Sequence, residues 1–137
     1  MTTIKSQESL VDKKQEVLFH FLSDMNNLQT LMPSQVTDWK SNNTECSFKV
    51  TGLTGIALKI KSTEPFSLIR YSETGKMPFA FELKAHFKPH ESDPSKTWTS
   101  LSFEADLNPM LKMMVEKPLT NFINLLASRL PELANKC

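Results

Sequence analysis

Histidines are the side chains of this chain that could most readily bind a metal. His20 lies one helical turn after Glu16 and one turn before Asp24, a spacing that can place a pair of ligands on one helix face. A histidine on a helix surface is the interpretation we prefer, because no third ligand accompanies the pair. His86 alternates with lysines on a polar strand face and His90 lies in a loop flanked by prolines, and neither has a ligand partner nearby. The sequence therefore predicts no metal site.

Carboxylates could serve in acid–base catalysis if they were held in an apolar environment. Glu45, Glu82, Glu104 and Asp106 instead occupy positions that alternate toward solvent. The chain has only three glycines and none of the phosphate-loop, zinc or serine-nucleophile motifs. We therefore predict no catalytic residue and no cofactor.

Methionines are the one compositional feature that hints at a ligand. Met110, Met113 and Met114 cluster near the start of a predicted helix, and flexible thioethers suit surfaces that adapt to varied apolar partners. Ordinary core filling is the alternative, and we prefer it. Arg70 and Tyr71 are adjacent on a predicted strand, so at most one of them faces the interior. An inward polar group needs a partner, which a ligand headgroup could supply.

The composition limits the function classes. The 137 residues carry 16 basic and 15 acidic side chains, interleaved along the chain, with a net charge of +1. This argues against nucleic acid and against an anionic membrane as partners. The length predicts one domain, residues 1–137. Two cysteines supply no disulfide framework, the first residues show no apolar export signal, and no stretch is long enough to span a bilayer. We expect a cytoplasmic protein without stable membrane insertion, and the sequence does not indicate its oligomeric state.

The last third of the chain determines the architecture. Residues 97–107 alternate between apolar and polar side chains, as a half-buried strand does. Asn108 can cap a helix, and Pro109 fits its first position because the missing amide would be unbonded there. An apolar stripe at spacings of three and four then predicts a helix over residues 109–129, with a kink at Pro118 and an end near Pro131. The stripe comprises Leu111, Met114, Val115, Leu119, Phe122, Leu126 and Leu130.

The remaining elements are predicted to precede this helix in a simple order. Residues 4–11 form a strand, Asp12 caps a short helix, and residues 27–32 form another helical turn or two before Pro33. Six strands follow, joined by short turns that favour antiparallel pairing. We expect them near residues 36–40, 45–51, 55–64, 68–73, 79–88 and 97–107.

The strands have one apolar and one polar face. Phe79, Phe81, Leu83, Ala85 and Phe87 share a side, and the strands of residues 45–51 and 55–64 show the same alternation. Such strands make a curved sheet with one apolar face, and the long C-terminal helix is its natural cover. The expected fold class is therefore a two-layer α+β domain.

This order of elements resembles the START-like superfamily, which includes the SRPBCC and polyketide cyclase/dehydrase proteins. The resemblance covers nearly the whole chain and rests on patterning around Asp24-Met25-Asn26, Leu31-Met32-Pro33, Pro78-Phe79-Ala80-Phe81 and Asn108-Pro109-Met110-Leu111. It implies a helix-grip fold, in which an antiparallel sheet of about seven strands wraps around the C-terminal helix and two short helices follow the first strand. It also implies a small hydrophobic ligand, such as a lipid, polyketide or quinone, in the hollow between sheet and helix. The chain is shorter than the lipid-transfer members, which implies a small or filled cavity.

Three functional hypotheses follow from this interpretation. The leading one is a protein that binds an apolar ligand between the sheet and the C-terminal helix. A second is a cyclase or hydro-lyase that folds a polyketide-like substrate, and a third is a non-catalytic interaction protein with a filled cavity. We expect binding rather than catalysis. The candidate ligand-binding residues are Phe48, Leu58, Arg70, Tyr71, Phe81, Leu83, Phe103, Met114, Leu119 and Phe122.

Overall fold

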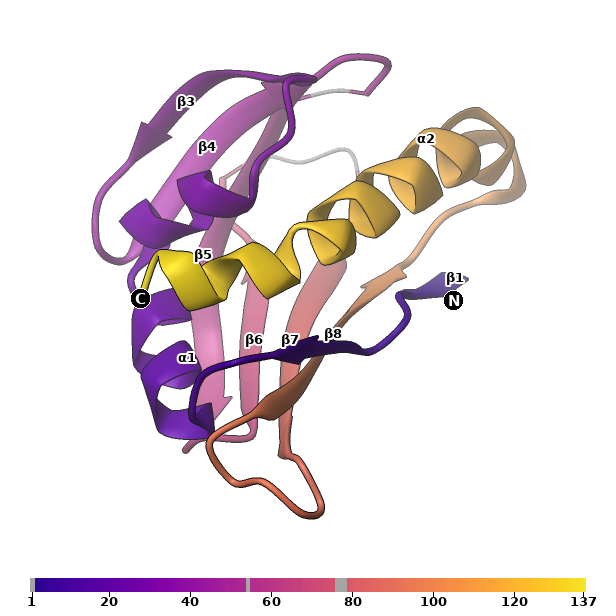
Figure 1. Ribbon diagram of the computed structural model, residues 1–137. Helices are drawn as coiled ribbons and strands as arrows, with labels where there is room; N and C mark the ends of the chain where they lie inside the picture. The colour runs from indigo at the N-terminus through magenta and orange to yellow at the C-terminus, as the bar shows by residue number, and fades with distance from the viewer. Residues whose placement is uncertain (1, 54, 76–78) are drawn as a thin grey trace.

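A computed structural model describes residues 2–53, 55–75 and 79–137 of the chain (Figure 1). Two short strands and two short helical segments come first, then six longer strands, and finally the long helix. Their bounds are β1 Thr2–Lys5, β2 Ser9–Val11, α1 Gln15–Leu22, the 3-10 helix η1 Met25–Leu31, β3 Val36–Ser41, β4 Glu45–Val50, β5 Gly55–Glu64, β6 Leu68–Glu73, β7 Phe81–Pro89, β8 Thr97–Ala105, α2 Pro109–Ser128 and the 3-10 helix η2 Leu130–Asn135.

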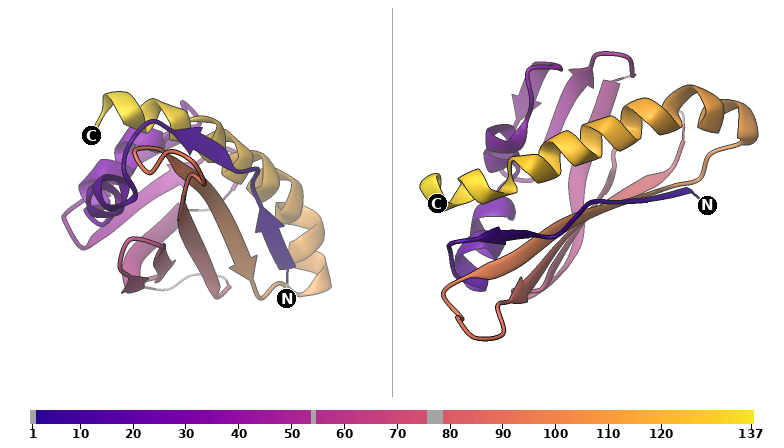
Figure 2. Two further views of the ribbon diagram at one scale, coloured as in Figure 1. Left: turned by 60° about the horizontal axis from the view of Figure 1, so that its bottom comes forward. Right: turned by 45° about the vertical axis from the view of Figure 1, so that its right-hand side comes forward.

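The strands form one antiparallel sheet in the order β1-β8-β7-β6-β5-β4-β3, and β2 also pairs with β8. The six strands from β3 to β8 follow one another as a meander, as the short turns predicted. The sheet curves, and α2 lies across its concave side while α1 and η1 cover one end (Figure 2). This arrangement confirms the predicted α+β helix-grip fold.

The predicted first strand, residues 4–11, is divided into β1 and β2. Ser6 causes the division, because its amide donates to the Leu101 carbonyl (2.9 Å) while its hydroxyl accepts from the Leu101 amide (2.9 Å). A side-chain oxygen thus replaces a backbone carbonyl in the ladder. Between the pairs Thr2–Ala105 and Ser9–Thr99 the N-terminal segment advances seven residues and β8 only six, so the register shifts by one residue.

The predicted cap of α1 was wrong. The helix begins at Gln15, and its cap residue is Lys14, whose side chain forms no capping hydrogen bond. The chain stays bound to the sheet beyond Asp12, because Thr97 donates its hydroxyl hydrogen to the Lys13 carbonyl (2.8 Å). The helix can therefore start only after Lys13.

The predicted start of α2 is confirmed. The Asn108 side chain accepts from the Leu111 amide (2.9 Å), and Pro109 occupies the first helical position. The helix continues through Pro118 as one element to Ser128, one residue short of the predicted end. Pro131 lies within η2, which extends the helical cover of the core beyond α2.

Candidate functional site

The inner face of the sheet brings together eight of the ten predicted ligand-binding residues. All eight are at most 6% exposed and belong to one apolar cluster. Two aromatic contacts tie the cluster together: the Phe48 and Phe122 rings lie 6.1 Å apart between β4 and α2, and the Phe81 and Phe103 rings stack at 5.2 Å. The eight residues are Phe48, Leu58, Tyr71, Phe81, Leu83, Phe103, Leu119 and Phe122.

Tyr71 and Arg70 face opposite sides of the sheet, which confirms that at most one of them points inward. The buried Tyr71 hydroxyl donates to the Leu22 carbonyl at the end of α1 (2.7 Å). Burial raises the pKa of Tyr71 well above its usual range, and the nearby Cys46 adds to the effect. The Arg70 guanidinium lies on the other side, 2.9 Å from a Glu64 carboxylate oxygen. Tyr71 therefore anchors α1 to the sheet, and Arg70 does not line the interior.

Met114 lies outside the cluster. It is 66% exposed, and its neighbours Met110 and Met113 are 73% and 88% exposed. Met114 and Val115 lie three and four residues after Leu111, so they flank the direction in which Leu111 points. Val115 packs against the core, and Met114 therefore faces solvent. The methionine cluster is thus a surface feature of α2.

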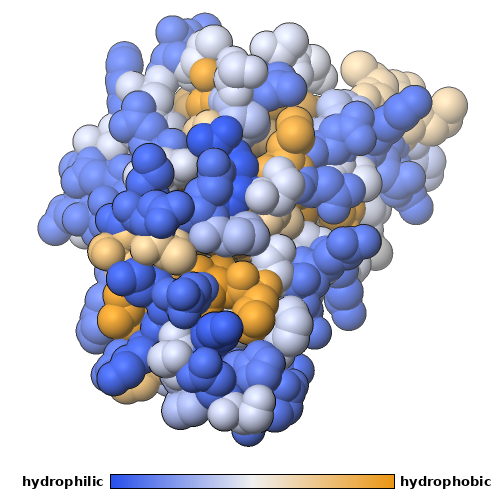
Figure 3. Space-filling model, in the orientation of Figure 1, coloured by the Kyte–Doolittle hydropathy of each residue, from blue (hydrophilic) through white to orange (hydrophobic). Residues whose placement is uncertain are grey.

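The buried residues of α2 begin only at Leu119. The first half of the helix, residues 109–118, follows β8 at the end of the sheet where β4, β6 and β8 finish and where β5 and β7 begin. Figures 1 and 2 show this half projecting to the side of the strands, and Figure 3 shows apolar side chains at the surface between it and the upper part of β4. The first half of α2 therefore contributes no fully buried side chain to the interior, and Val115 is its half-buried apolar residue that packs against the core.

Four of the half-buried apolar residues that pack against the core at this end are Leu53, Phe79, Leu107 and Val115. They come from the turn after β4, the segment before β7, the link after β8 and the first half of α2. We call these four residues the apolar rim. The sequence pattern did not identify the rim as a unit, although Leu53, Phe79 and Leu107 lie in the links between elements and Val115 lies in the predicted stripe of the long helix.

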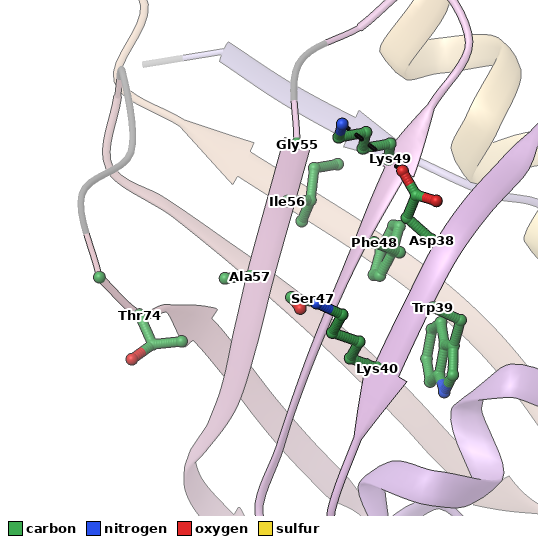
Figure 4. A pocket seen from close by; sticks show the side chains of 11 residues that line it. Asp38, Trp39, Lys40, Ser47, Phe48, Lys49, Gly55, Ile56, Ala57 and Thr74 are labelled. Atoms are coloured by element: carbon green, nitrogen blue, oxygen red, sulfur yellow. Dashed lines mark ion pairs between the residues drawn. The ribbon is translucent and has the colours of Figure 1, made fainter.

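A second feature is a hollow of about 800 Å³ that lies along β3, β4 and β5 (Figure 4). Trp39 stacks on Phe48 at 5.3 Å with an angle of 17° between the rings, while Asp38 and Lys49 form an exposed ion pair of 3.5 Å at the margin. Asp38 has a positive φ of 56° where the β3–β4 register is interrupted. The hollow is open to solvent, and in the described residues no hydrogen bond joins the Ser47 hydroxyl to a histidine or carboxylate that could activate it.

The remaining polar groups differ in their exposure and in their partners. No group of three histidine, cysteine, aspartate or glutamate side chains suitable for a metal occurs among residues 2–53, 55–75 and 79–137. Glu45 and Asp106 are exposed as predicted, whereas Glu82 and Glu104 are partly covered and pair with Lys61 (3.0 Å) and Lys84 (3.1 Å). Burial raises the pKa of the Cys46 thiol to about 12, so it stays protonated at neutral pH.

None of the helices in the described part of the chain is both long enough and apolar enough to cross a membrane.

Comparisons with known proteins define the fold. No protein-family model matches the chain. No curated protein matches it either. Among solved structures, a START superfamily protein from Mycobacterium smegmatis is similar to it at a TM-score of 0.63 and 15% identity, covering 96% of this chain and 98% of that one. A protein from Thermus thermophilus is similar at a TM-score of 0.70 and 13% identity, with 98% of each chain covered. The KanY protein reaches 0.73 at 5% identity, covering 98% of this chain and 97% of that one.

Proposed function

Because the chain has the START-like helix-grip fold, we propose that it binds a small apolar molecule between the sheet and the first half of α2. The observation that carries the proposal is that the apolar inner face of the sheet extends further than the buried residues of α2. The apolar inner face of the sheet reaches the end of β8, with Phe103 and Ala105 buried, whereas α2 contributes no buried residue before Leu119. A ligand inserted beside Val115 would cover the inner face where the helix covers it least.

The interior is suited to an apolar ligand because its polar groups are already used. On the inner face of β8, the buried Thr97 hydroxyl donates to the Lys13 carbonyl and the buried Thr99 hydroxyl donates to the Ser9 carbonyl. Tyr71 is likewise bonded to the Leu22 carbonyl. Affinity would then come from apolar surface removed from water, at about 25 cal/mol per Å². A lipid, polyketide or quinone-like molecule has the required apolar surface.

Entry would take place at the apolar rim. Its residues lie in turns and at the start of a helix, where the backbone is held by fewer ladder hydrogen bonds than in the strands. The rim residues pack against the core in the structure, so a ligand must separate the first half of α2 from the start of β7 and the end of β8. Exposure of the three methionines beside this opening provides an adaptable apolar surface.

The positions of the polar groups favour binding without catalysis. The enzyme alternative depends on Tyr71 or Arg70 as the participating group. Tyr71 is committed to the Leu22 carbonyl, and Arg70 points to the outer face. Neither side chain is available to a substrate held against the inner face.

Val115→Trp tests the site directly, because the added indole occupies the space proposed for the ligand. Leu125→Trp, on the same helix but away from the rim, is the matched control. The probe is 1-anilinonaphthalene-8-sulfonate, whose fluorescence rises in apolar sites. We expect Val115→Trp to weaken probe binding about fivefold or more, equal to about 1 kcal/mol, and Leu125→Trp to leave it within about twofold. Equal effects of the two variants, or no probe binding by the parent protein, would contradict the proposal.

A further inference from the structure

The outer face of the sheet carries a row of positive charges across four strands. In the strand register, Lys5 of β1 lies opposite Ser102 of β8, Ser102 lies opposite Lys84 of β7, and Lys84 lies opposite Arg70 of β6. Neighbouring strands are about 4.8 Å apart, so Lys5 and Lys84 flank Ser102 at about 10 Å from each other. Like charges placed this closely repel one another unless anions lie among them.

The carboxylates near this row compensate it only in part. Lys84 pairs with Glu104 (3.1 Å) and Arg70 pairs with Glu64 (2.9 Å). Lys5 forms no ion pair within the residues that the structure describes. The row therefore keeps an excess positive charge at its β1 end.

Neutral hydrogen-bonding groups lie at the same place. Ser102 is only 7% exposed, and its hydroxyl lies 2.9 Å from His86 Nε2. Burial lowers the pKa of His86, and Lys84, Lys5 and Arg70 lower it further, so the imidazole is neutral at pH 7. If Nε2 accepts from Ser102, Nδ1 carries a hydrogen; if Nε2 donates, the Ser102 hydroxyl hydrogen is free. Either arrangement leaves one donor for a third group.

A hollow of about 650 Å³ adjoins these side chains, and Lys5, Lys84, His86 and Ser102 all line it. Two ammonium groups, a hydroxyl and an imidazole are donors that suit the oxygens of an anion. We propose that this hollow binds an oxyanion, a carboxylate or phosphate group, held between Lys5 and Lys84 beside the Ser102–His86 pair. The site lies on the opposite face from the apolar rim and does not depend on the proposed function.

Binding at this site should depend on pH. A bound anion stabilises the protonated form of His86 and opposes the effect of the three cations, so it raises the pKa of His86. By linkage, the anion binds more tightly as pH falls and His86 takes up a proton. Glu104 and Glu8 also line the hollow and repel an anion, but each pairs with a lysine, Glu104 with Lys84 and Glu8 with Lys88 (3.8 Å).

The test is an NMR titration of the His86 imidazole from pH 8 to 5, with inorganic phosphate or acetate as probe and chloride at the same ionic strength as reference. We expect a probe at saturation to raise the His86 pKa by about 0.5 or more. Acetate and phosphate acting alike would identify a general oxyanion site, and phosphate acting alone would identify a phosphate site.

Three variants test whether the anion binds at this hollow. Lys5→Met should weaken binding of the active probe about fivefold or more, through loss of the charge at the β1 end, whereas the exposed Lys117→Met control should leave it unchanged. His86→Gln should bind acetate with little dependence on pH between pH 8 and 6, where acetate itself stays ionised. The proposal is overturned if neither probe moves the His86 pKa relative to chloride, or if Lys5→Met and Lys117→Met behave alike.

Discussion

At the residue scale, the buried Tyr71 side chain links the sheet to α1. The Tyr71 hydroxyl is the only link of its kind between the centre of the sheet and the end of α1 among the hydrogen bonds of the described residues. Tyr71→Phe removes this donor and leaves the Leu22 carbonyl without its partner. We expect it to lower the free energy of unfolding by about 1–3 kcal/mol, measured by chemical denaturation.

Arg70→Met is the matched comparison on the neighbouring position. Its ion pair with Glu64 is partly exposed, so its loss should change the free energy of unfolding by less than about 1 kcal/mol. Both variants should retain binding of an apolar probe, because neither side chain is proposed to contact the ligand. A larger stability loss for Arg70→Met than for Tyr71→Phe would contradict this assignment.

The buried thiol and phenol also predict how stability depends on pH. Burial raises the pKa of Cys46 from 9.0 to about 12 and raises the pKa of Tyr71 above its usual range. Above pH 9 the unfolded chain loses these protons while the folded chain keeps them, so unfolding becomes more favourable. We expect the free energy of unfolding to be fully retained at pH 8 and to fall steadily between pH 9 and 11. Thermal unfolding at each pH measures this change. A Cys46→Ala, Tyr71→Phe double variant should lose less over this interval, and an equal loss would show that other groups cause it.

At the element scale, α2 is divided into two halves with different roles. The second half carries the buried stripe from Leu119 onward, whereas the first half presents three methionines to solvent. Replacing Met110, Met113 and Met114 together by Gln should change the free energy of unfolding by less than about 1 kcal/mol. Phe122→Ala should cost about 3–5 kcal/mol, because it opens a cavity beside Phe48. Chemical denaturation of the two variants side by side checks the division, and similar losses would contradict it.

The same helix shows which features a sequence pattern can predict and which it cannot. Its capping residue, its start and its apolar stripe were predictable because they depend on local chemistry and on the 3.6-residue period. The placement of Met114 was not, because Met114 and Val115 both fit a spacing of three or four from Leu111. The sheet decides between them, since only one side of the first half of α2 faces β8 and the apolar rim. The Asp12 cap failed for a similar reason: a tertiary hydrogen bond from Thr97 to Lys13 delays the helix.

At the scale of the whole molecule, alternation along the strands predicted the fold class and the interior residues of the strands. The short turns predicted the antiparallel meander, and helical spacing predicted Leu119 and Phe122. The break between β1 and β2 could not be predicted, because it arises from a Ser6 side chain that bonds to a strand distant in sequence. The apolar rim and the Lys5–Ser102–Lys84–Arg70 row also depend on the register between strands, which a single sequence pattern does not fix.

Native mass spectrometry tests the central claim, that an apolar molecule binds between the sheet and the first half of α2. It would be recorded on the protein as purified and after incubation with palmitate and with ubiquinone-1, for the parent protein, for Val115→Trp and for Leu125→Trp. The account predicts a one-to-one adduct with an endogenous apolar molecule or with an added one, reduced in Val115→Trp and retained in Leu125→Trp. Absence of every adduct from the parent protein, or adducts equally abundant in both variants, would contradict it.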